Sequence, residues 1–409
     1  MTPAVGYTAM KDSGIPWIGE IPKSWDIVRG KNTITLLERP VNSSDDVITC
    51  FRDGEVTLRK NRREEGFTNS LKEIGYQGVN PGDLVVHGMD GFAGSIGISD
   101  SRGKASPVLN VLDSTQNKRY LMYYLRGMAY KDVFMALSTG IRVRSCDLRW
   151  NKLSVFPFLL PSLSEQSAIA AYLDAQCAKI DEIIAEAKAS IEDYKQWKES
   201  IIYEAVTKGL DPNAEMKDSG IDIIGEVPAK WSLVRVRFLC SIMTGNQDTQ
   251  NAEVDGCYPF YVRSPKVERS NTYTFDGEGV LMAGDGAGAG RVFHHAFGKY
   301  AIHQRVYCFH SFHNVLPDFF CYFMEVLFSI EMDKGSAKST VPSVRLPMLL
   351  NFSICIPTKY EQEQIVNMLN KKCADIEKII TEKTKLIDDI EAYKKSLIYE
   401  AVTGKRSVC

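Results

Sequence analysis

At 409 residues the chain is long for one compact domain, so we expect two or three globular units joined by an extended element. Its 49 Lys and Arg are balanced by 51 Asp and Glu, and the net charge of -2 argues against a protein that coats nucleic acid through a uniformly basic surface. No stretch approaches the ~20 consecutive apolar residues of a membrane-spanning helix. The N-terminal residues lack the basic and apolar regions of an export signal, so we expect a cytoplasmic protein without membrane contact.

An internal duplication organises the chain. Residues 10–29 return as residues 216–235 with 13 of 20 positions identical, and residues 165–207 return as residues 361–403 with 20 of 43 identical. Both copies of the longer repeat end in Tyr-Glu-Ala-Val-Thr. The sequences between the repeats diverge almost completely. The duplication therefore predicts two globular units of unlike sequence, each flanked by the same pair of repeated segments. The predicted segments are 1–160, 161–210, 211–357 and 358–409.

The longer repeats predict two long helices. Their apolar residues alternate spacings of four and three, which is the heptad pattern of a coiled coil. A proline and a Ser/Thr-x-x-Glu capping box precede each helix, and Gly209 and Gly404 follow the last turns. The predicted seam residues are Leu173, Ile180, Ile183, Tyr194, Trp197 and Ile201 in the first helix, and Leu369, Ile376, Ile379, Leu386, Ile390, Tyr393 and Leu397 in the second.

The two predicted helices share one register, so each has a partner of matching pattern. About forty residues at ~1.5 Å each give rods of roughly 60 Å, too long to be buried inside one domain. A whole unit intervenes between them along the chain, so the second helix can return beside the first as an antiparallel coiled coil with pseudo-twofold symmetry. The alternative is that each helix pairs with another chain.

The divergent segments, roughly 30–160 and 236–357, predict α+β domains rich in short strands. Each also contains one helical stretch, around 118–136 and 317–332. Strand-like runs occur at 45–51, 82–87, 258–262, 279–283, 290–294 and 305–309.

Motifs of catalysis are missing from the sequence. The run from Gly284 to Gly290 has neither dinucleotide-fold nor P-loop spacing, and predicts a glycine-rich turn. His294, His295 and His303 lie close in sequence without a cysteine or carboxylate at a familiar metal spacing. Ten cysteines without any Cys-x-x-Cys pair are typical of free thiols in a reducing compartment. We therefore expect no catalytic residue, metal or cofactor in this chain.

The remaining polar residues suit the recognition of bases and phosphates. Arginine can fork onto guanine, glutamine can pair with adenine, and a carboxylate can accept from cytosine. The alternative is that these clusters are solvated surface or internal ion pairs. The candidates in the first divergent segment are Arg52, Arg59, Lys60, Arg62, Arg63, His87, Arg142 and Arg144. Those in the second are Arg263, Lys266, Arg269, Asp285, His303, Gln304, Arg305, Lys338 and Arg345.

Several phrases together resemble one family. They are the twin Lys-Asp-Ser-Gly-Ile…Trp openings at 11–25 and 217–231, the twin Pro-Ser/Thr-x-x-Glu-Gln helix starts at 161–166 and 357–362, the Tyr-Glu-Ala-Val-Thr closures, and the run 281–291 followed by 303–307. The chain resembles the specificity subunit of type I restriction-modification enzymes over nearly its whole length.

The resemblance implies a non-catalytic, sequence-specific DNA-binding protein. Two target recognition domains, 1–160 and 211–357, would each read one half of a split asymmetric site in double-stranded DNA. The helices would space the halves and dock two modification subunits, which carry S-adenosylmethionine chemistry. Restriction subunits, using ATP and Mg, would carry translocation and cleavage.

Two other functions stay open from the sequence. One is a stand-alone DNA-binding protein or inhibitor of the same kind, acting without partner subunits. The other is a coiled-coil scaffold that holds two domains binding protein or glycan, which would leave the basic cluster at 52–63 unexplained. The bases read, the spacer length and the methylated adenines are not encoded in any motif of one chain.

Overall fold

A computed structural model describes residues 7–62, 73–137, 148–335 and 342–408. It divides into two compact units, residues 1–187 with 385–409 (unit 1) and residues 188–384 (unit 2). Each unit therefore combines one globular domain with part of both long helices. This is the predicted α+β architecture of two domains joined by helices.

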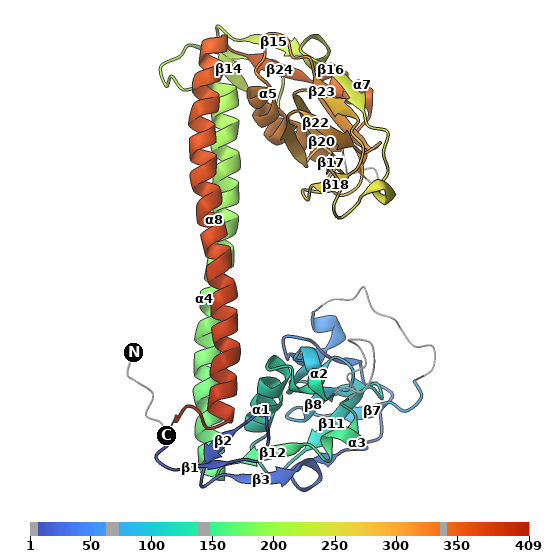
Figure 1. Cartoon of the computed structure of the whole chain (residues 1–409), viewed down its shortest axis with the longest axis vertical. Helices are drawn as coiled ribbons and strands as arrows, with labels where there is room; N and C mark the ends of the chain where they lie inside the picture. Colours follow the sequence, from blue (N-terminus) through green and yellow to red (C-terminus); the bar gives the residue numbers. More distant parts are fainter. Residues whose placement is uncertain (1–6, 63–72, 138–147, 336–341, 409) are drawn as a thin grey trace. The chain divides into compact units, whose positions relative to one another are not determined.

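The long helices are α4 (Leu163–Lys208) and α8 (Lys359–Val402), and they run side by side in each unit (Figure 1). In unit 1, Lys394 Nζ of α8 lies 2.7 Å from Asp181 Oδ2 of α4. In unit 2, Lys198 Nζ of α4 lies 2.7 Å from Glu377 Oε1 of α8. The first part of each helix thus pairs with the last part of the other, which confirms the antiparallel pairing. Lys198 and Lys394, like their two partners, occupy equivalent repeat positions, as pseudo-twofold symmetry requires.

The packing seam of these helices differs from the predicted one at four positions. Ile183, Trp197, Leu386 and Tyr393 were expected in the seam but are 48%, 52%, 51% and 44% exposed. Ile184 and Ile387 are buried in unit 1, and the two residues on each side of them are exposed. From Ile180 the next seam residue follows after four positions, at Ile184, whereas the prediction placed it after three, at Ile183. Each of these four seam positions therefore falls one residue later than predicted. Leu173, Ile180, Leu369, Ile376 and Leu397 are buried, and Tyr194, Ile201, Ile379 and Ile390 are half-buried.

The domain of unit 1 is built on a four-stranded antiparallel sheet. Its strands, in spatial order, are β4 (Thr35–Leu36), β11 (Leu109–Asp113), β8 (Leu84–His87) and β9 (Ile96–Ile98). Helix α1 (Lys118–Tyr130) packs against β8 and β9. Three further antiparallel pairs are β5 (Ile48–Cys50) with β6 (Val56–Leu58), β7 (Gln77–Val79) with β10 (Gly103–Ala105), and β3 (Asp26–Arg29) with β12 (Pro157–Leu160). Two short helices, α2 (Val133–Ala136) and α3 (Trp150–Leu153), complete the domain.

The domain of unit 2 repeats this topology with a different sequence. Its four-stranded sheet has the order β16 (Ser241–Thr244), β23 (Val306–His310), β20 (Gly279–Ala283) and β21 (Phe293–Ala296). A second sheet has the order β18 (Glu268–Ser270), β17 (Tyr258–Tyr261), β22 (Lys299–Ile302) and β19 (Phe275–Asp276), and β15 (Ser232–Arg235) pairs with β24 (Ser353–Ile356). The helical segments are α5 (Pro317–Phe323), the π-helical turn Met324–Phe328, α6 (Ser329–Gly335) and α7 (Leu346–Asn351). The strand expected at 290–294 begins only at Phe293, because the glycine run before it forms a turn.

The short repeats receive the ends of the long helices. They form the hairpins β1 (Met10–Asp12) with β2 (Glu20–Pro22), and β13 (Met216–Asp218) with β14 (Glu226–Pro228). In unit 1 the hydroxyl of Tyr399 on α8 donates to the Trp17 carbonyl at 2.6 Å. In unit 2 the hydroxyl of Tyr203 on α4 donates to the Ile224 carbonyl at 3.2 Å. Both repeated motifs therefore belong to one recurring joint, in which a Tyr-Glu-Ala-Val-Thr helix end sits on a hairpin.

A half-buried histidine, His295, links the sheet of unit 2 to helix α5. His295 Nδ1 lies 2.7 Å from Asp318 Oδ1 in the first turn of α5, and its Nε2 lies 3.0 Å from Glu278 Oε1. Burial by itself lowers the pKa of His295, but the hydrogen bonds and charges of the two carboxylates outweigh it, so the pKa is raised above its ordinary value. The charged imidazole is the form that holds the two acids.

This clamp predicts a pH dependence of stability in unit 2. A histidine pKa that is higher in the folded state stabilises the fold fully below the unfolded pKa of about 6.5, and the contribution is lost as pH rises through the folded pKa. We expect His295→Gln to remove this part of the pH dependence between pH 6 and 9, measured as protection factors of the amides of β21 and α5, which correct hydrogen exchange for its intrinsic dependence on pH. A wild-type protein whose protection factors in these elements do not change over that range would contradict the assignment.

Candidate nucleic-acid interface

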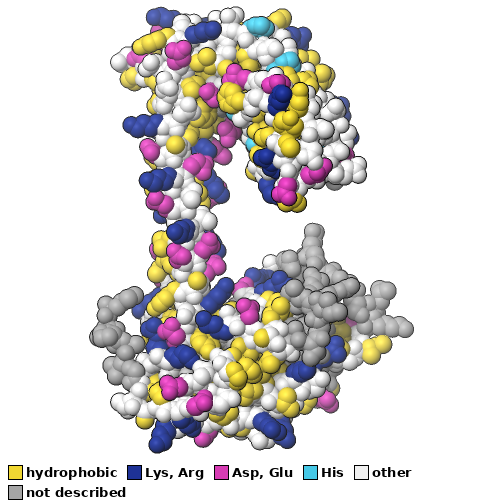
Figure 2. Space-filling model, in the orientation of Figure 1, with side chains coloured by type: hydrophobic (Ala, Val, Ile, Leu, Met, Phe, Trp, Pro, Cys, Tyr) yellow, Lys and Arg dark blue, Asp and Glu magenta, His cyan; other side chains and the backbone are white. Residues whose placement is uncertain are grey.

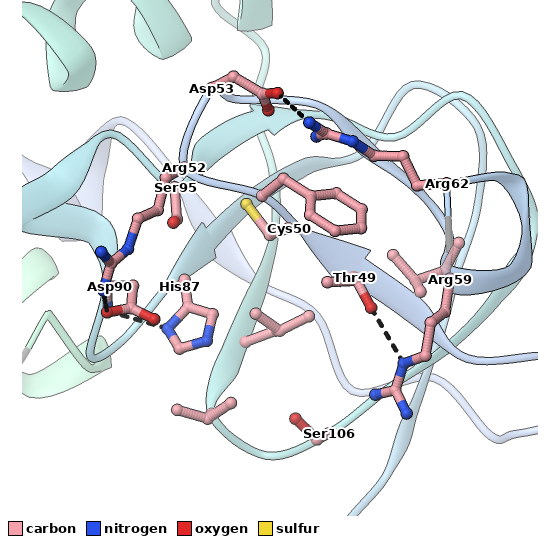
Figure 3. A pocket seen from close by; sticks show the side chains of 14 residues that line it. Thr49, Cys50, Arg52, Asp53, Arg59, Arg62, His87, Asp90, Ser95 and Ser106 are labelled. Atoms are coloured by element: carbon pink, nitrogen blue, oxygen red, sulfur yellow. Dashed lines mark hydrogen bonds and ion pairs between the residues drawn. The ribbon is translucent and has the colours of Figure 1, made fainter. Parts of the chain in front are cut away.

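A polar pocket of about 740 Å³ opens in the domain of unit 1. The hairpin β5–β6, the short 3-10 turn after it and the loop that follows β8 supply its charged residues, as Figure 3 shows. Arg52 lies in the turn of the hairpin, Arg59 and Arg62 lie in the 3-10 turn at 59–62, and His87 and Asp90 come from β8 and its loop. Sequence analysis selected four of these five residues, and the fold brings them together from segments more than twenty residues apart.

The arginines of this pocket are held by different partners. Arg52 Nη2 lies 3.0 Å from Asp90 Oδ1. Arg62 lies 2.6 Å from Asp53 and 3.2 Å from Glu55, and its guanidinium stands 4.3 Å from the centre of the Phe51 ring. The hydrogen bond to Asp53 raises the pKa of Arg62 above its ordinary value. Arg62 is therefore engaged on three sides, whereas the Arg52 side chain remains 61% exposed.

His87 presents a fixed hydrogen-bond donor to the same pocket. Its Nδ1 accepts from the backbone N–H groups of Met89 at 3.2 Å and Asp90 at 3.0 Å. Burial lowers the pKa of His87, so the neutral ring is favoured at neutral pH. A neutral imidazole that accepts at Nδ1 carries its proton on Nε2. The pocket thus combines guanidinium and imidazole donors with carboxylate acceptors, which is the chemistry of base edges and phosphates.

The domain of unit 2 has a pocket of about 520 Å³ with a related arrangement. Arg263, in the loop between β17 and β18, places Nη1 2.9 Å from Asp285 Oδ1, in the loop after β20. Arg305 Nε lies 3.7 Å from the other oxygen of Asp285. The fold therefore brings together three of the predicted residues, with Arg263 and Arg305 both next to the carboxylate of Asp285.

The two arginine–aspartate pairs occupy equivalent places in the two domains. Each arginine lies two residues after the first strand of a hairpin, β5 or β17, and each aspartate lies just after the equivalent sheet strand, β8 or β20. A glycine begins each aspartate loop. The Gly88 N–H donates to the Val108 carbonyl at 2.7 Å, and the Gly284 N–H donates to the Arg305 carbonyl at 2.8 Å.

Both glycines stand where another backbone segment approaches closely and leaves little room for a side chain. A Cβ atom at Gly88 would lie 3.0 Å from the carbonyl oxygen that its own N–H contacts, and one at Gly284 would lie 2.9 Å from the equivalent oxygen. Their carbonyls also accept from equivalent residues, Leu148 N and Val344 N, both at 2.8 Å. In both domains, therefore, the loop that carries the aspartate is positioned by the same two backbone hydrogen bonds of its first glycine.

Three other predicted residues of unit 2, His303, Gln304 and Arg269, form hydrogen bonds within their own domain. His303 is only 2% exposed and its Nδ1 accepts from the Arg305 N–H at 2.9 Å, so its ring lies in an internal contact of the domain. Apolar packing against Phe260 and this loop bond account for its burial. Gln304 Nε2 donates to Asp248 Oδ2 at 2.6 Å. Arg269 on β18 donates to the carbonyls of Gly256 and Cys257 at 2.7 and 3.1 Å, which joins β18 to the segment before β17.

The remaining candidates are surface residues or lie outside the described ranges. Lys60 pairs with Asp46 at 2.5 Å, Lys266 pairs with Glu268 at 2.9 Å, and Arg59 Nε donates to Thr49 Oγ1 at 3.4 Å. Arg345 is exposed at the start of α7. Arg63, Arg142, Arg144 and Lys338 lie outside the described residues.

Asp90 is the functional candidate that sequence analysis missed. Its signal was weak, because an acidic residue shortly after a glycine is common in turns. The sequence does contain one signal, because the same order of strand, glycine and aspartate occurs at 84–90 and again at 279–285. Only the shared topology shows that the two runs are equivalent.

No group of three His, Cys, Asp or Glu within the described ranges could hold a metal ion. Over those same ranges, no helix has the length and apolar character to cross a membrane. Basic and acidic side chains are interspersed along the long helices on the face that Figure 2 shows, rather than gathered by sign. The charged contacts that suit nucleic acid are thus local, in the loops of the two domains.

Comparison with known proteins agrees with this organisation. The family model described as the type I restriction modification DNA specificity domain matches residues 228–389. The EcoDI specificity subunit of Escherichia coli is 24% identical over 181 residues, which is 44% of this chain and 40% of that relative. The MjaVIII specificity subunit of Methanocaldococcus jannaschii is 23% identical over 421 aligned positions, covering 94% of this chain and 93% of the relative.

A solved structure from work on complex assembly and conformational transition of the type I R-M system has the same fold. Its chain superposes with a TM-score of 0.71 at 15% sequence identity, covering 93% of this chain and 98% of that one. The likeness therefore extends over both domains and both long helices. The family model and the two relatives thus show what this chain is similar to, type I restriction-modification specificity subunits, and the solved structure shows that it shares their fold.

Proposed function

We propose that this chain is the sequence-specific DNA-recognition subunit of a type I restriction-modification complex. It reads double-stranded DNA in the cytoplasm and carries out neither methylation nor cleavage itself. The observation that carries the proposal is the pairing of two domains of one topology and unlike sequence with a duplicated helix pair. Each domain reads one half of a bipartite site, and the site is asymmetric because the two domains present different side chains.

The repeated parts of the chain suit a repeated partner. Like surfaces related by approximate twofold symmetry bind two copies of one subunit in the same way. We assign the helices and their hairpin joints to two modification subunits, which would hold S-adenosylmethionine. Restriction subunits, using ATP and Mg, would complete the complex. A net charge of -2 fits this division, because partner subunits can supply much of the phosphate contact that governs non-specific affinity.

The long helices also suit a spacer between two readers. One turn of DNA spans ~34 Å, so two readers held at a fixed separation can reach the same face of the duplex with unread base pairs between them. A helix pair resists changes in length better than a flexible linker does. The number of unread base pairs in the site would therefore be constant.

A selection from random duplex DNA tests the proposal. The chain, purified in complex with its modification subunit, would be used to recover bound sequences at a stated salt concentration. We expect two short defined blocks separated by a gap of constant length. The modification subunit alone is the control and should select no such pair of blocks. Recovery without any sequence preference would contradict the proposal, and defined blocks from the chain without the modification subunit would favour a stand-alone DNA-binding protein.

A further inference from the structure

The two equivalent arginine–aspartate pairs, Arg52–Asp90 and Arg263–Asp285, contribute little to the stability of the fold. Arg52 and Asp90 are 61% and 32% exposed, and Arg263 and Asp285 are 43% and 24% exposed. Exposed ion pairs contribute little or nothing to the stability of a fold. The two domains share almost no sequence, yet both place this pair at the same point of the fold, on the rim of a pocket.

An arginine held by a carboxylate is suited to reading guanine. Its planar guanidinium carries five N–H donors, so a bond from one Nη group to aspartate leaves other donors for a ligand. Two parallel N–H groups match the O6 and N7 acceptors of guanine in the major groove, which is the commonest specific contact between protein and DNA. The aspartate limits the rotation of the long side chain and so lowers the entropy that binding must remove.

The other basic residues of the two loops fit this task less well. Arg62 is already bonded to Asp53 and Glu55 and lies over Phe51. Arg269, on β18, is bonded to two backbone carbonyls of the segment before β17. In contrast, the pairs Arg52–Asp90 and Arg263–Asp285 each join two separate loops that begin at equivalent strands. They are the common element of two otherwise different surfaces.

We infer that Arg52 and Arg263 are specificity-determining residues that each read one guanine, one in each half of the DNA site, and that Asp90 and Asp285 are the positioning residues that aim them. The inference rests on the proposed function and deepens it, since it states which base each half-site contains and which side chain selects it. In unit 2, Asp285 also holds Arg305 through its second oxygen.

Arginine-to-lysine variants test the assignment, because lysine keeps the charge but not the bidentate fork. Arg52→Lys and Arg263→Lys would each be made in the full chain, purified with the modification subunit, and used in selection from random duplex DNA. We expect Arg52→Lys to lose the preference for guanine at one position of one block, by about five- to 150-fold in relative affinity. The other block should be unchanged, and Arg263→Lys should show the reverse pattern.

Two further measurements distinguish base reading by these arginines from other roles: the salt dependence of DNA affinity, and the effect of replacing the aspartates. The slope of log affinity against log salt should be unchanged in both lysine variants, because the number of charges is the same. Asp90→Asn should relax the same base position as Arg52→Lys, and the double variant should relax it no further than Arg52→Lys alone. A structural role for Asp90 would instead weaken binding to all sequences alike.

Three results would overturn the inference. They are unchanged selection of every base, a uniform loss of affinity across sequences, and relaxation of the same block by both lysine variants. A wild-type complex that selects two defined blocks while the lysine variants leave them intact would refute the arginine assignment alone. A wild-type complex without any sequence preference would refute the proposed function itself.

Discussion

Replacing Ile184 or Ile387 by alanine is expected to destabilise unit 1 by about 2–5 kcal/mol, which is the usual cost of such a truncation in a packed interior. Both side chains are buried, at 7% and 6% exposure, although the residues around them on each helix are exposed. Each therefore buries its side chain against the partner helix. Urea unfolding of the full chain, followed by hydrogen exchange of the two helices, measures the loss.

The neighbouring apolar residues provide matched controls for this experiment. Ile183 and Leu386 precede the two buried isoleucines by one position and are 48% and 51% exposed. Alanine at either should change stability by no more than about 0.5 kcal/mol. If Ile183→Ala were as damaging as Ile184→Ala, the seam would follow the spacing predicted from sequence rather than the one in the structure.

Truncating Trp25 to alanine is expected to cost unit 1 about 3–5 kcal/mol, the range for a fully buried large aromatic residue. Trp25 is fully buried, and its Nε1 donates to Glu165 Oε1 at the start of α4 at 3.0 Å. Its ring also lies against Gly404 at the end of α8, where an added Cβ would come within 3.5 Å of it. The indole therefore joins the N-terminal hairpin to both long helices.

The duplication supplies the control for Trp25. Trp231 is the equivalent residue of unit 2, is 3% exposed, and packs edge-on against Phe319. Trp25→Ala should increase hydrogen exchange in β1, β2 and the end of α8, whereas Trp231→Ala should do so in β13, β14 and the end of α4. Equal protection of all these elements in both variants would contradict the joint described above.

The architecture could be predicted from the sequence because the repeats made it visible. Two copies of a heptad pattern in one register require partners for both helices, and the intervening domain allows an antiparallel return. The exact seam could not be predicted in the same way. Ile183 and Ile184 are adjacent, as are Leu386 and Ile387, so either member of each pair satisfies the apolar pattern. Only the packing of the partner helix decides between them.

The candidate interface was predictable in composition but not in arrangement. A cluster of arginines at 52–63 is visible in the sequence, whereas the pairing of Arg52 with Asp90 spans 38 residues and depends on the fold. His303 is a second case in which the arrangement depends on the fold, because this polar side chain in a charged run is buried in its own loop. Hydrogen bonds to loop backbone are the physical reason, and no local sequence signal distinguishes such a histidine from an exposed one.

Mapping N6-methyladenine across host DNA tests the central claim most directly. The chain would be co-expressed with the modification subunit, and the map compared with that from cells expressing the modification subunit alone. We expect methylation at one split motif, with two defined halves around a gap of constant length, and loss of that motif when the chain is omitted. A methylation pattern that is the same with and without the chain would contradict it.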